Sequence, residues 1–163
     1  MPADFYMKMT DVEGESTAKN HEGEIELLSF SSGVSMPIGP RSTSGSVSVE
    51  KVSPSEVVIT KYADKASTKL FGNACMGTQA KEVIISVNRT DGQGGQVEYL
   101  QYQLADVLIS SFTQNGGGGG LPVESLSLNF GKIVITYTAT DPSTAAAQGS
   151  LTSGWDFAAN APV

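Results

Sequence analysis

The alternation of apolar and polar residues is most regular between residues 96 and 137. The run over 96–112 is rich in β-branched, aromatic and aliphatic residues, and the run over 124–137 alternates with a period of two. Between them lies a run of five glycines, residues 116–120. The pattern therefore predicts a long β-hairpin with a pliable connection at the centre of the fold.

A change of phase divides the second run at Gly131. The alternating apolar residues before it are Leu126, Leu128 and Phe130, and those after it, on the opposite parity, are Ile133, Ile135 and Tyr137. A one-residue shift at glycine is typical of a β-bulge, or of a strand that bends and passes from one sheet to another. We therefore expect a mainly β fold, an antiparallel β-barrel of two sheets that is closed or nearly closed.

Further strands are predicted over 4–9, 24–34, 46–51, 55–61 and 80–89, with a short terminal strand at 154–157 in which Trp155 packs back on the body. Side chains alternate along a strand. In the strand over 24–34, Leu28 and Phe30 are therefore expected to face the core. Ser29 and Ser31 would then face the opposite side.

One flanking α-helix is predicted over 64–76, with Asp64 as its N-cap and Gly77 as its C-terminal stop. Its expected apolar stripe consists of Leu70, Phe71, Ala74 and Cys75. Cys75 would be a small core residue on this stripe. The helix would cover an end or a side of the barrel.

Two segments interrupt the regular pattern within what we expect to be a single domain over residues 1–163. The segment 35–46 is polar and contains Pro37, Gly39, Pro40 and Gly45, so it is a candidate contact arm. The segment 139–152 is rich in alanine, serine and threonine, and a variable, loop-like tail is expected there.

Composition narrows the function further. The net charge is −7, and the 10 basic residues are scattered, which argues against binding nucleic acid. No apolar run reaches the length of a membrane span, and residues 1–9 lack the features of a signal peptide. The single cysteine excludes an intramolecular disulfide. These features favour a protein made in the cytoplasm and not inserted in a membrane.

The residues that carry catalytic chemistry do not form a recognisable site. His21 is the only histidine, so with Glu22 and Glu24 it does not match a zinc or iron site. The glycine run is not followed by Gly-Lys-Ser or Gly-Lys-Thr, and no Gly-x-Ser-x-Gly motif occurs. We therefore expect no catalytic residue, no cofactor and no metal, and a binding or structural protein. An enzyme with a convergent site around His21, Cys75 or the carboxylates stays a less favoured alternative.

Several sequence blocks resemble one family in order along the chain. They are Phe5-Tyr6-Met7-Lys8, the segment 11–16, His21, the segments 24–28, 60–65, 96–100 and 107–111, Leu128-Asn129-Phe130, the segment 133–137, and Gly154-Trp155. Together they are similar to the haemolysin-coregulated proteins, the tube subunits of the bacterial type VI secretion system. The blocks span nearly the whole chain, and no fused effector domain is expected.

The resemblance implies a homo-hexameric ring whose rings stack into a tube, propelled by a contracting sheath and ejected with a spike. Its partners would be sheath, spike and baseplate proteins and small effector proteins held in the lumen. Export would proceed through the type VI machine without a cleaved signal peptide. The alternatives are a phage tail-tube protein, which has a similar fold, and a monomeric β-barrel that binds a ligand.

The implied tube suggests candidate residues for its lumen and for its contacts. Ser29 and Ser31 are the candidates for facing the lumen. The candidates for contacts between subunits or between rings are Ser35, Met36, Pro37, Ile38, Arg41, Asp91, Gly92 and Asn115.

Overall fold

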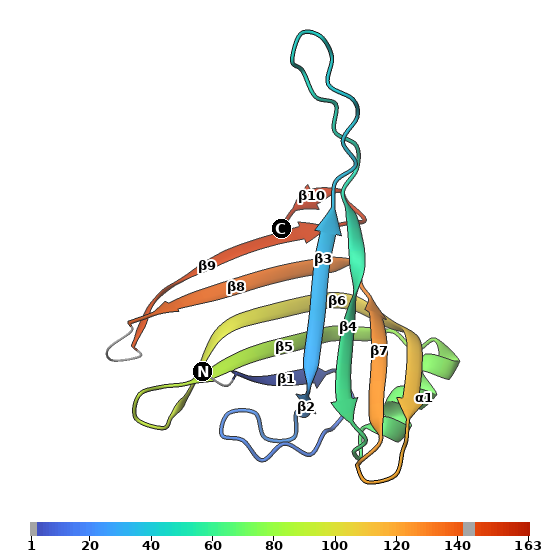
Figure 1. Ribbon diagram of the computed structural model, residues 1–163, viewed down its shortest axis with the longest axis vertical. Coiled ribbons are helices and arrows are strands. Elements are labelled where there is room, and N and C mark those ends of the chain that lie inside the picture. The colour runs from blue at the N-terminus through green and yellow to red at the C-terminus, as the bar shows by residue number, and fades with distance from the viewer. Residues whose placement is uncertain (1–2, 142–145) are drawn as a thin grey trace.

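The computed structural model describes residues 3–141 and 146–163, which form ten strands and one helix. In chain order they are β1 (Ala3–Met9), β2 (Ile25–Leu27), β3 (Ser29–Ser35), β4 (Ser53–Tyr62), α1 (Ser67–Met76), β5 (Ala80–Thr90), β6 (Gln96–Asn115), β7 (Val123–Asn129), β8 (Lys132–Thr140), β9 (Ala147–Asp156) and β10 (Ala161–Pro162). All strand pairs are antiparallel. Figure 1 shows two layers of strands that cross, with α1 at one side.

The two layers share β6. Sheet A has the strand order β10-β9-β8-β6-β5-β1-β2, and sheet B has the order β3-β4-β7-β6. The first half of β6 pairs with β5 and β8, and the second half pairs with β7. The predicted fold class, two antiparallel sheets with one flanking helix, is confirmed, but the sheets do not close into a complete barrel.

The predicted central hairpin and its phase change are confirmed. β7 belongs to sheet B and β8 to sheet A, and Gly131 lies between them, where its N–H donates to the carbonyl of Ala105 (3.0 Å). Within this hairpin the chain therefore crosses between sheets twice, once within β6 and once at Gly131. At the first crossing Asp106 has φ of 56°, in the left-handed region, whereas Gly131 does not.

This angle at Asp106 predicts the effect of substitution there. Asp106→Val is expected to lower the free energy of unfolding by about 1–2 kcal/mol, because a β-branched residue is strained in the left-handed region. Asp106→Gly removes the same exposed carboxylate without that strain, and should be neutral or stabilising. Urea denaturation at one protein concentration compares them. Equal stability of the two variants would contradict the expectation.

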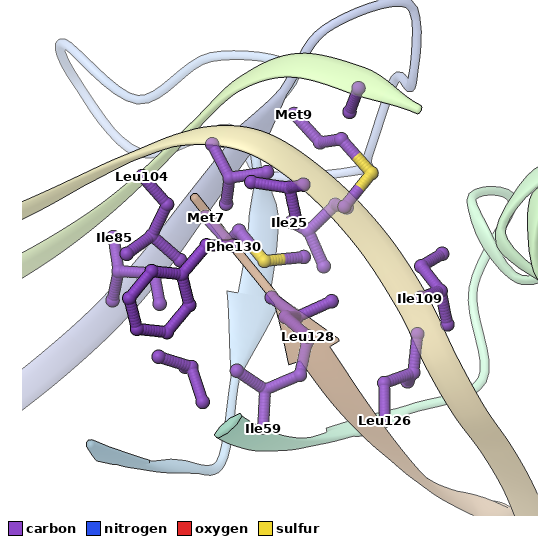
Figure 2. Packing of buried hydrophobic residues seen from close by; sticks show 14 of the residues in the cluster. Met7, Met9, Ile25, Ile59, Ile85, Leu104, Ile109, Leu126, Leu128 and Phe130 are labelled. Atoms are coloured by element: carbon purple, nitrogen blue, oxygen red, sulfur yellow. The ribbon is translucent and has the colours of Figure 1, made fainter. Parts of the chain in front are cut away.

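The core lies between the sheets and is almost wholly aliphatic (Figure 2). Sheet B contributes fully buried residues from β4 and β7, and sheet A contributes residues from β1, β5 and β6. The main members are Met7, Val57, Ile59, Val83, Ile85, Leu104, Leu126, Leu128, Phe130 and Ile133. The alternating apolar residues predicted for β7 and for the start of β8 therefore lie on the faces that point into the core. Trp155 packs against this core, as predicted.

One charged cluster is buried at the lower end of sheet B. The Lys61 ammonium is fully buried and donates to Glu124 Oε2 (2.8 Å), Asp64 Oδ1 (2.9 Å) and the carbonyl of Tyr62 (2.8 Å). Glu124 is also fully buried, and its Oε1 accepts from Gln114 Nε2 (2.8 Å). The cluster joins β4, β6 and β7 to the segment that leads into α1.

The prediction of one strand over 24–34 with Leu28 inward is wrong. Ile25 and Leu27 are buried in sheet A, Leu28 is 42% exposed, and the chain then enters sheet B as β3. Phe30 does pack against the core, so the predicted inward and outward faces are correct from Ser29 onward and reversed before it. The chain passes from sheet A to sheet B at Leu28, and this change reverses which alternate side chains point into the core.

Two other strand predictions differ from the structure. Residues 46–51 form no strand of their own, because β4 begins at Ser53 and continues through Pro54. The tail expected over 139–152 is strand at both ends, where β8 and β9 pair, and the remainder that falls on residues 142–145 lies outside the described residues. The ladder between β8 and β9 supplies the backbone partners that a loop would lack.

The helix begins three residues later than predicted, with Ala66 at the N-cap position and Gly77 ending it at φ 64°. Asp64 instead accepts from the N–H of Ala66 through Oδ1 (2.9 Å) in the preceding turn. Leu70 is fully buried, but Phe71 and Cys75 are exposed, so the expectation that Cys75 is a core residue is wrong. The buried stripe runs through Ala66, Leu70 and Asn73, because these residues recur at helical spacing on one face.

Candidate functional site

The outer face of sheet B is covered with small hydroxyl side chains. Because Val57, Ile59, Leu126 and Leu128 face the core, the alternate positions of β4 and β7 face outward. The outward residues that share this hydroxyl character are Ser29, Ser31, Thr60, Ser111, Thr113, Ser125 and Ser127. The parity predicted for Ser29 and Ser31 is therefore correct, and both side chains are exposed.

Among the described contacts, the side-chain hydrogen bonds of this face join different strands of the sheet. Ser29 Oγ and Thr60 Oγ1 lie 2.5 Å apart on neighbouring strands. Ser110, the extra residue at a register shift in β6, donates to Glu56 Oε2 (2.6 Å) and to the carbonyl of Ser127 (3.2 Å). The result is a mostly polar outer face, to which Glu56 contributes a carboxylate and Val58, between Ser31 and Ser127, an aliphatic side chain.

Sheet B ends in two unpaired edges. In the described residues, β3 pairs only with β4, and the part of β6 from Leu108 to Asn115 pairs only with β7. Neither edge contains a charged residue, and neither contains proline. Natural proteins usually protect exposed strand edges with charges or proline, so two bare edges are suited to pairing with another chain. The two edge strands run in opposite directions, so copies placed edge to edge would continue the antiparallel sheet.

The segment between β3 and β4, residues 36–52, projects away from the body (Figure 1), and we call it the arm. Its two sides are held together by a bridge between Ile38 and Val49, and by the N–H of Gly39 donating to the carbonyl of Ser48 (3.0 Å). Ile38 is 67% and Val49 is 65% exposed. The backbone of the arm is therefore held by its own hydrogen bonds, but the rest of the chain does not cover the side chains of Ile38 and Val49.

The structure places five predicted contact residues on or beside the arm. Ser35 ends β3, and Met36, Pro37 and Ile38 follow it on the first side of the arm. Arg41 lies further toward the tip, and all five side chains are exposed. The five residues therefore share one exposed segment, and their role in contacts between subunits stays a prediction.

The remaining contact candidates lie apart from it and from each other. Asp91 and Gly92 form the β5–β6 turn, in which Asp91 Oδ1 accepts from the N–H groups of Gln93 (2.8 Å) and Gly95 (2.6 Å). Asn115 ends β6 at the opposite end of the molecule (Figure 1), where the glycine run connects to β7. The turn at Asp91 is thus fixed by its own side chain, whereas the glycine run has no such bond among the described contacts.

A shallow apolar groove of about 300 Å³ lies at the base of the arm, and sequence reasoning missed it. It is formed where the end of β3 and the base of the arm meet β8 and β9, with Val34, Met36, Ile135, Trp155 and Phe157 among its walls. Ile135 and Tyr137 alternate with Ile133 and so appear as core positions in the sequence, but they are 36% and 44% exposed. This groove is part of the side of the sandwich that sheet B does not cover.

His21 has a structural environment. Its ring is buried and stacks on Tyr6 with centroids 4.4 Å apart. Its Nδ1 lies 2.8 Å from Glu24 Oε2, and Asn88 Nδ2 lies 2.9 Å from its Nε2. Burial raises the pKa of the Tyr6 phenol, which donates to Gln96 Oε1 (3.3 Å). These contacts fasten the loop between β1 and β2 to the outer face of sheet A.

Over residues 3–141 and 146–163, no group of three or more His, Cys, Asp and Glu side chains is arranged to hold a metal ion. In the same part of the chain, no helix is long and apolar enough to cross a membrane. The prominent surfaces are instead a hydroxyl-covered sheet, two bare strand edges and an exposed arm. Such surfaces are typical of a structural protein that assembles with other protein chains.

The comparisons with known proteins agree with this class. A family model described as "Type VI secretion system effector, Hcp" matches residues 6–137. Protein Hcp1 of Pseudomonas aeruginosa is 32% identical over 161 residues, which is 98% of each sequence. A solved structure of a type six secretion system protein is 26% identical, with a TM-score of 0.91, and covers 99% of this chain and 100% of its own. A type VI secretion system effector from Yersinia pestis is 25% identical, with a TM-score of 0.76, over 94% and 99% of the two chains.

The chain belongs to the Hcp family. It is a tube subunit and secreted protein of the type VI secretion system, as the resemblance of its sequence blocks predicted. The family is structural and non-enzymatic, and its members form hexameric tube rings.

Proposed function

We propose that this chain forms a hexameric ring by joining the free edge of β3 in one copy to the free edge of the second half of β6 in the next. The observation that carries the proposal is the pair of bare, uncharged and oppositely directed edges of sheet B. Because the two edges are different surfaces, the contact is heterologous and generates a ring when the rotation closes. Each copy would then add four strands to one continuous antiparallel sheet.

In this ring, the hydroxyl-covered face of sheet B lines the lumen. Ser29, Ser31 and their neighbours would present a wet surface on which small effector proteins are held loosely enough to be released. The exposed aliphatic pair Ile38 and Val49 on the arm supports a second contact, in which the arm reaches an adjacent subunit or the next ring. The turns at Asp91, Gly92 and Asn115 would lie near the ring faces.

The stacked rings would be the tube that a contracting sheath drives outward, with baseplate and spike proteins as further partners. The subunit would be made in the cytoplasm and leave through the type VI machine without a cleaved signal peptide. The net charge of −7 supports a soluble subunit that does not bind nucleic acid.

Negative-stain microscopy and sedimentation of the purified protein test the ring. Rings with sixfold symmetry and a sedimenting mass of six subunits are expected. A particle that stays at the 17.0 kDa of one chain at high concentration would overturn the proposal.

The lumen assignment has its own test. Ser31→Arg should leave the rings intact but reduce the amount of a co-expressed small effector that purifies with them, because an unpaired cation would project into the wet lumen. Thr17→Arg, in the exposed loop between β1 and β2, adds the same charge away from sheet B and is the control. Equal effector retention by the two variants would show that Ser31 does not face the lumen.

A further inference from the structure

Asn115 and Gly116 form the junction between β6 and the glycine run. Asn115 is the last residue of β6, where it pairs with Val123, and Gly116 is the first of the five glycines. The chain contains six asparagines, and Asn115 is the only one that glycine follows. In such a pair the asparagine amide can react with the next backbone nitrogen, because glycine has no side chain to block the approach.

The surroundings of this junction leave both reacting groups unrestrained. Asn115 is exposed, and its side chain has no hydrogen bond among the described contacts. The N–H of Gly116 likewise has no backbone acceptor among them. A Cβ built on Gly116 or Gly117 would meet nothing within 4 Å, so no neighbouring segment packs against the start of the glycine run. The Asn115 amide can therefore turn toward the nitrogen of Gly116.

Asp91–Gly92 is the only other place in the sequence where aspartate or asparagine precedes glycine, and its geometry is different. Asp91 Oδ1 accepts from the N–H groups of Gln93 (2.8 Å) and Gly95 (2.6 Å). The N–H of Asp91 also donates to the carbonyl of Gly95 (2.7 Å). These bonds hold the Asp91 carboxylate within its own turn. The chain thus restrains one of the two pairs and leaves the other free.

We propose that Asn115 is a self-modification site, at which the side-chain amide becomes a carboxylate through a cyclic imide formed with Gly116. The Gly116 nitrogen loses its proton to hydroxide and attacks Cγ of Asn115. The new C–N bond forms as the bond from Cγ to Nδ2 breaks, and Nδ2 leaves as ammonia with a proton from water. Water then opens the imide at either carbonyl carbon, which gives aspartate or isoaspartate. The only co-reactant is water, and no oxidant or reductant takes part.

The new carboxylate would weaken the ring, and this consequence rests on the proposed function. Asn115 pairs with Val123, Val123 pairs with Tyr62, and β3 begins beside this end of β4 (Figure 1). Copies in a closed ring lie at one height, so Asn115 would lie near the start of β3 in the next copy, just after the exposed Glu26. A carboxylate at this place adds like-charge repulsion, and a charge on a strand edge opposes pairing. Rings would therefore become less stable as the protein ages.

Peptide mapping by mass spectrometry tests the modification on the parent protein. The tryptic peptide over 90–132 contains Asn115 and also Asn129, which lies within β7 and precedes Phe130. During incubation, conversion of amide to acid should accumulate at Asn115 in both the aspartate and the isoaspartate form. It should be faster at about pH 8 than at about pH 6, because hydroxide removes the backbone proton. Conversion of Asn115 no faster than that of Asn129 would overturn the proposal.

Two alanine variants test the role of the reacting nitrogen. Gly116 and Gly117 both have open space at the Cβ position and a φ outside the left-handed region, so Gly116→Ala and Gly117→Ala should both fold. Gly116→Ala should slow the conversion of Asn115 at least about tenfold, because the added Cβ crowds the ring that must close. Gly117→Ala should convert at the rate of the parent protein. Equal rates in the two variants would contradict attack by the Gly116 nitrogen.

Two substitutions of Asn115 itself separate the modification from its effect on assembly. Asn115→Asp supplies the carboxylate at once, so its fraction of protein sedimenting as rings should be several-fold below that of the neutral Asn115→Gln. Conversion at Asn115 in the parent protein, with equal ring fractions in these two variants, would overturn the effect on the ring and leave the modification site standing. Absence of rings in the parent protein would overturn the proposed function, and the peptide map would still decide the modification.

Discussion

Replacing Lys61 with methionine is expected to lower the free energy of unfolding by about 3–5 kcal/mol, a large part of the stability of a domain of this size. The ammonium group is fully buried and is the partner of Glu124 and Asp64, at 2.8 and 2.9 Å. Methionine preserves most of the side-chain volume but leaves the buried Glu124 carboxylate without its cation. The cost is therefore mainly that of an uncompensated buried charge.

The same reasoning predicts how the loss is recovered. In the double variant Lys61→Met with Glu124→Leu, the fully buried pair of charges is absent and only the partly accessible Asp64 loses its cation, so much of the lost stability should return. Lys65→Met is the matched control, because the Lys65–Glu13 pair is exposed and such pairs contribute at most about 1 kcal/mol. Urea denaturation at fixed protein concentration measures all three. A Lys61→Met variant no less stable than Lys65→Met would contradict the prediction.

Shortening the arm is expected to abolish the end-to-end stacking of rings while leaving the subunit folded. Removal of residues 38–49, with a two-residue turn in their place, takes away the exposed Ile38–Val49 pair and no member of the core. The melting temperature of the subunit should therefore change little. Electron microscopy would count stacked rings, and a sedimentation profile would show whether single rings persist.

A subtler variant separates apolar contact from simple length. Ile38→Ser with Val49→Ser keeps the arm and its backbone bonds but removes its aliphatic surface, so stacking should weaken here too. Single rings without stacks would assign the arm to the next ring, and loss of the rings themselves would assign it to the adjacent subunit. Stacks as abundant as in the unmodified protein would show that the arm makes neither contact.

The local sequence determined most of the strands and their order. Alternation with a period of two identified β1, β5 and β7, and the change of parity at Gly131 located the crossing between sheets. The parity of Ser29 and Ser31 placed them on the outer face of sheet B. These features are local, because the direction of a side chain follows from the backbone of its own strand.

Only the tertiary structure decided which of these faces are covered. Leu27 is buried and Leu28 exposed because the chain changes sheets between them, and no local pattern marks that change. Ile135 has the spacing of a core residue, yet sheet B ends before it reaches that position. The alternation of apolar and polar residues shows that the two faces of a strand differ. Which face is buried depends on the strands and sheets that pack against it, and these are distant in the sequence.

The same limit applies to charge and to the helix. Lys61 and Glu124 are 63 residues apart in sequence, and their burial together depends on the pairing of β4 with β7. The apolar pattern of α1 identified a helix, but it did not identify which of Leu70 and Cys75 the core would cover. The sequence by itself determined most of the strands and the family of this protein. The packing of distant elements decided its buried ion cluster, its unpaired strand edges and the partly exposed face of sheet A at Ile135, because burial is a property of contacts between segments and not of any one segment.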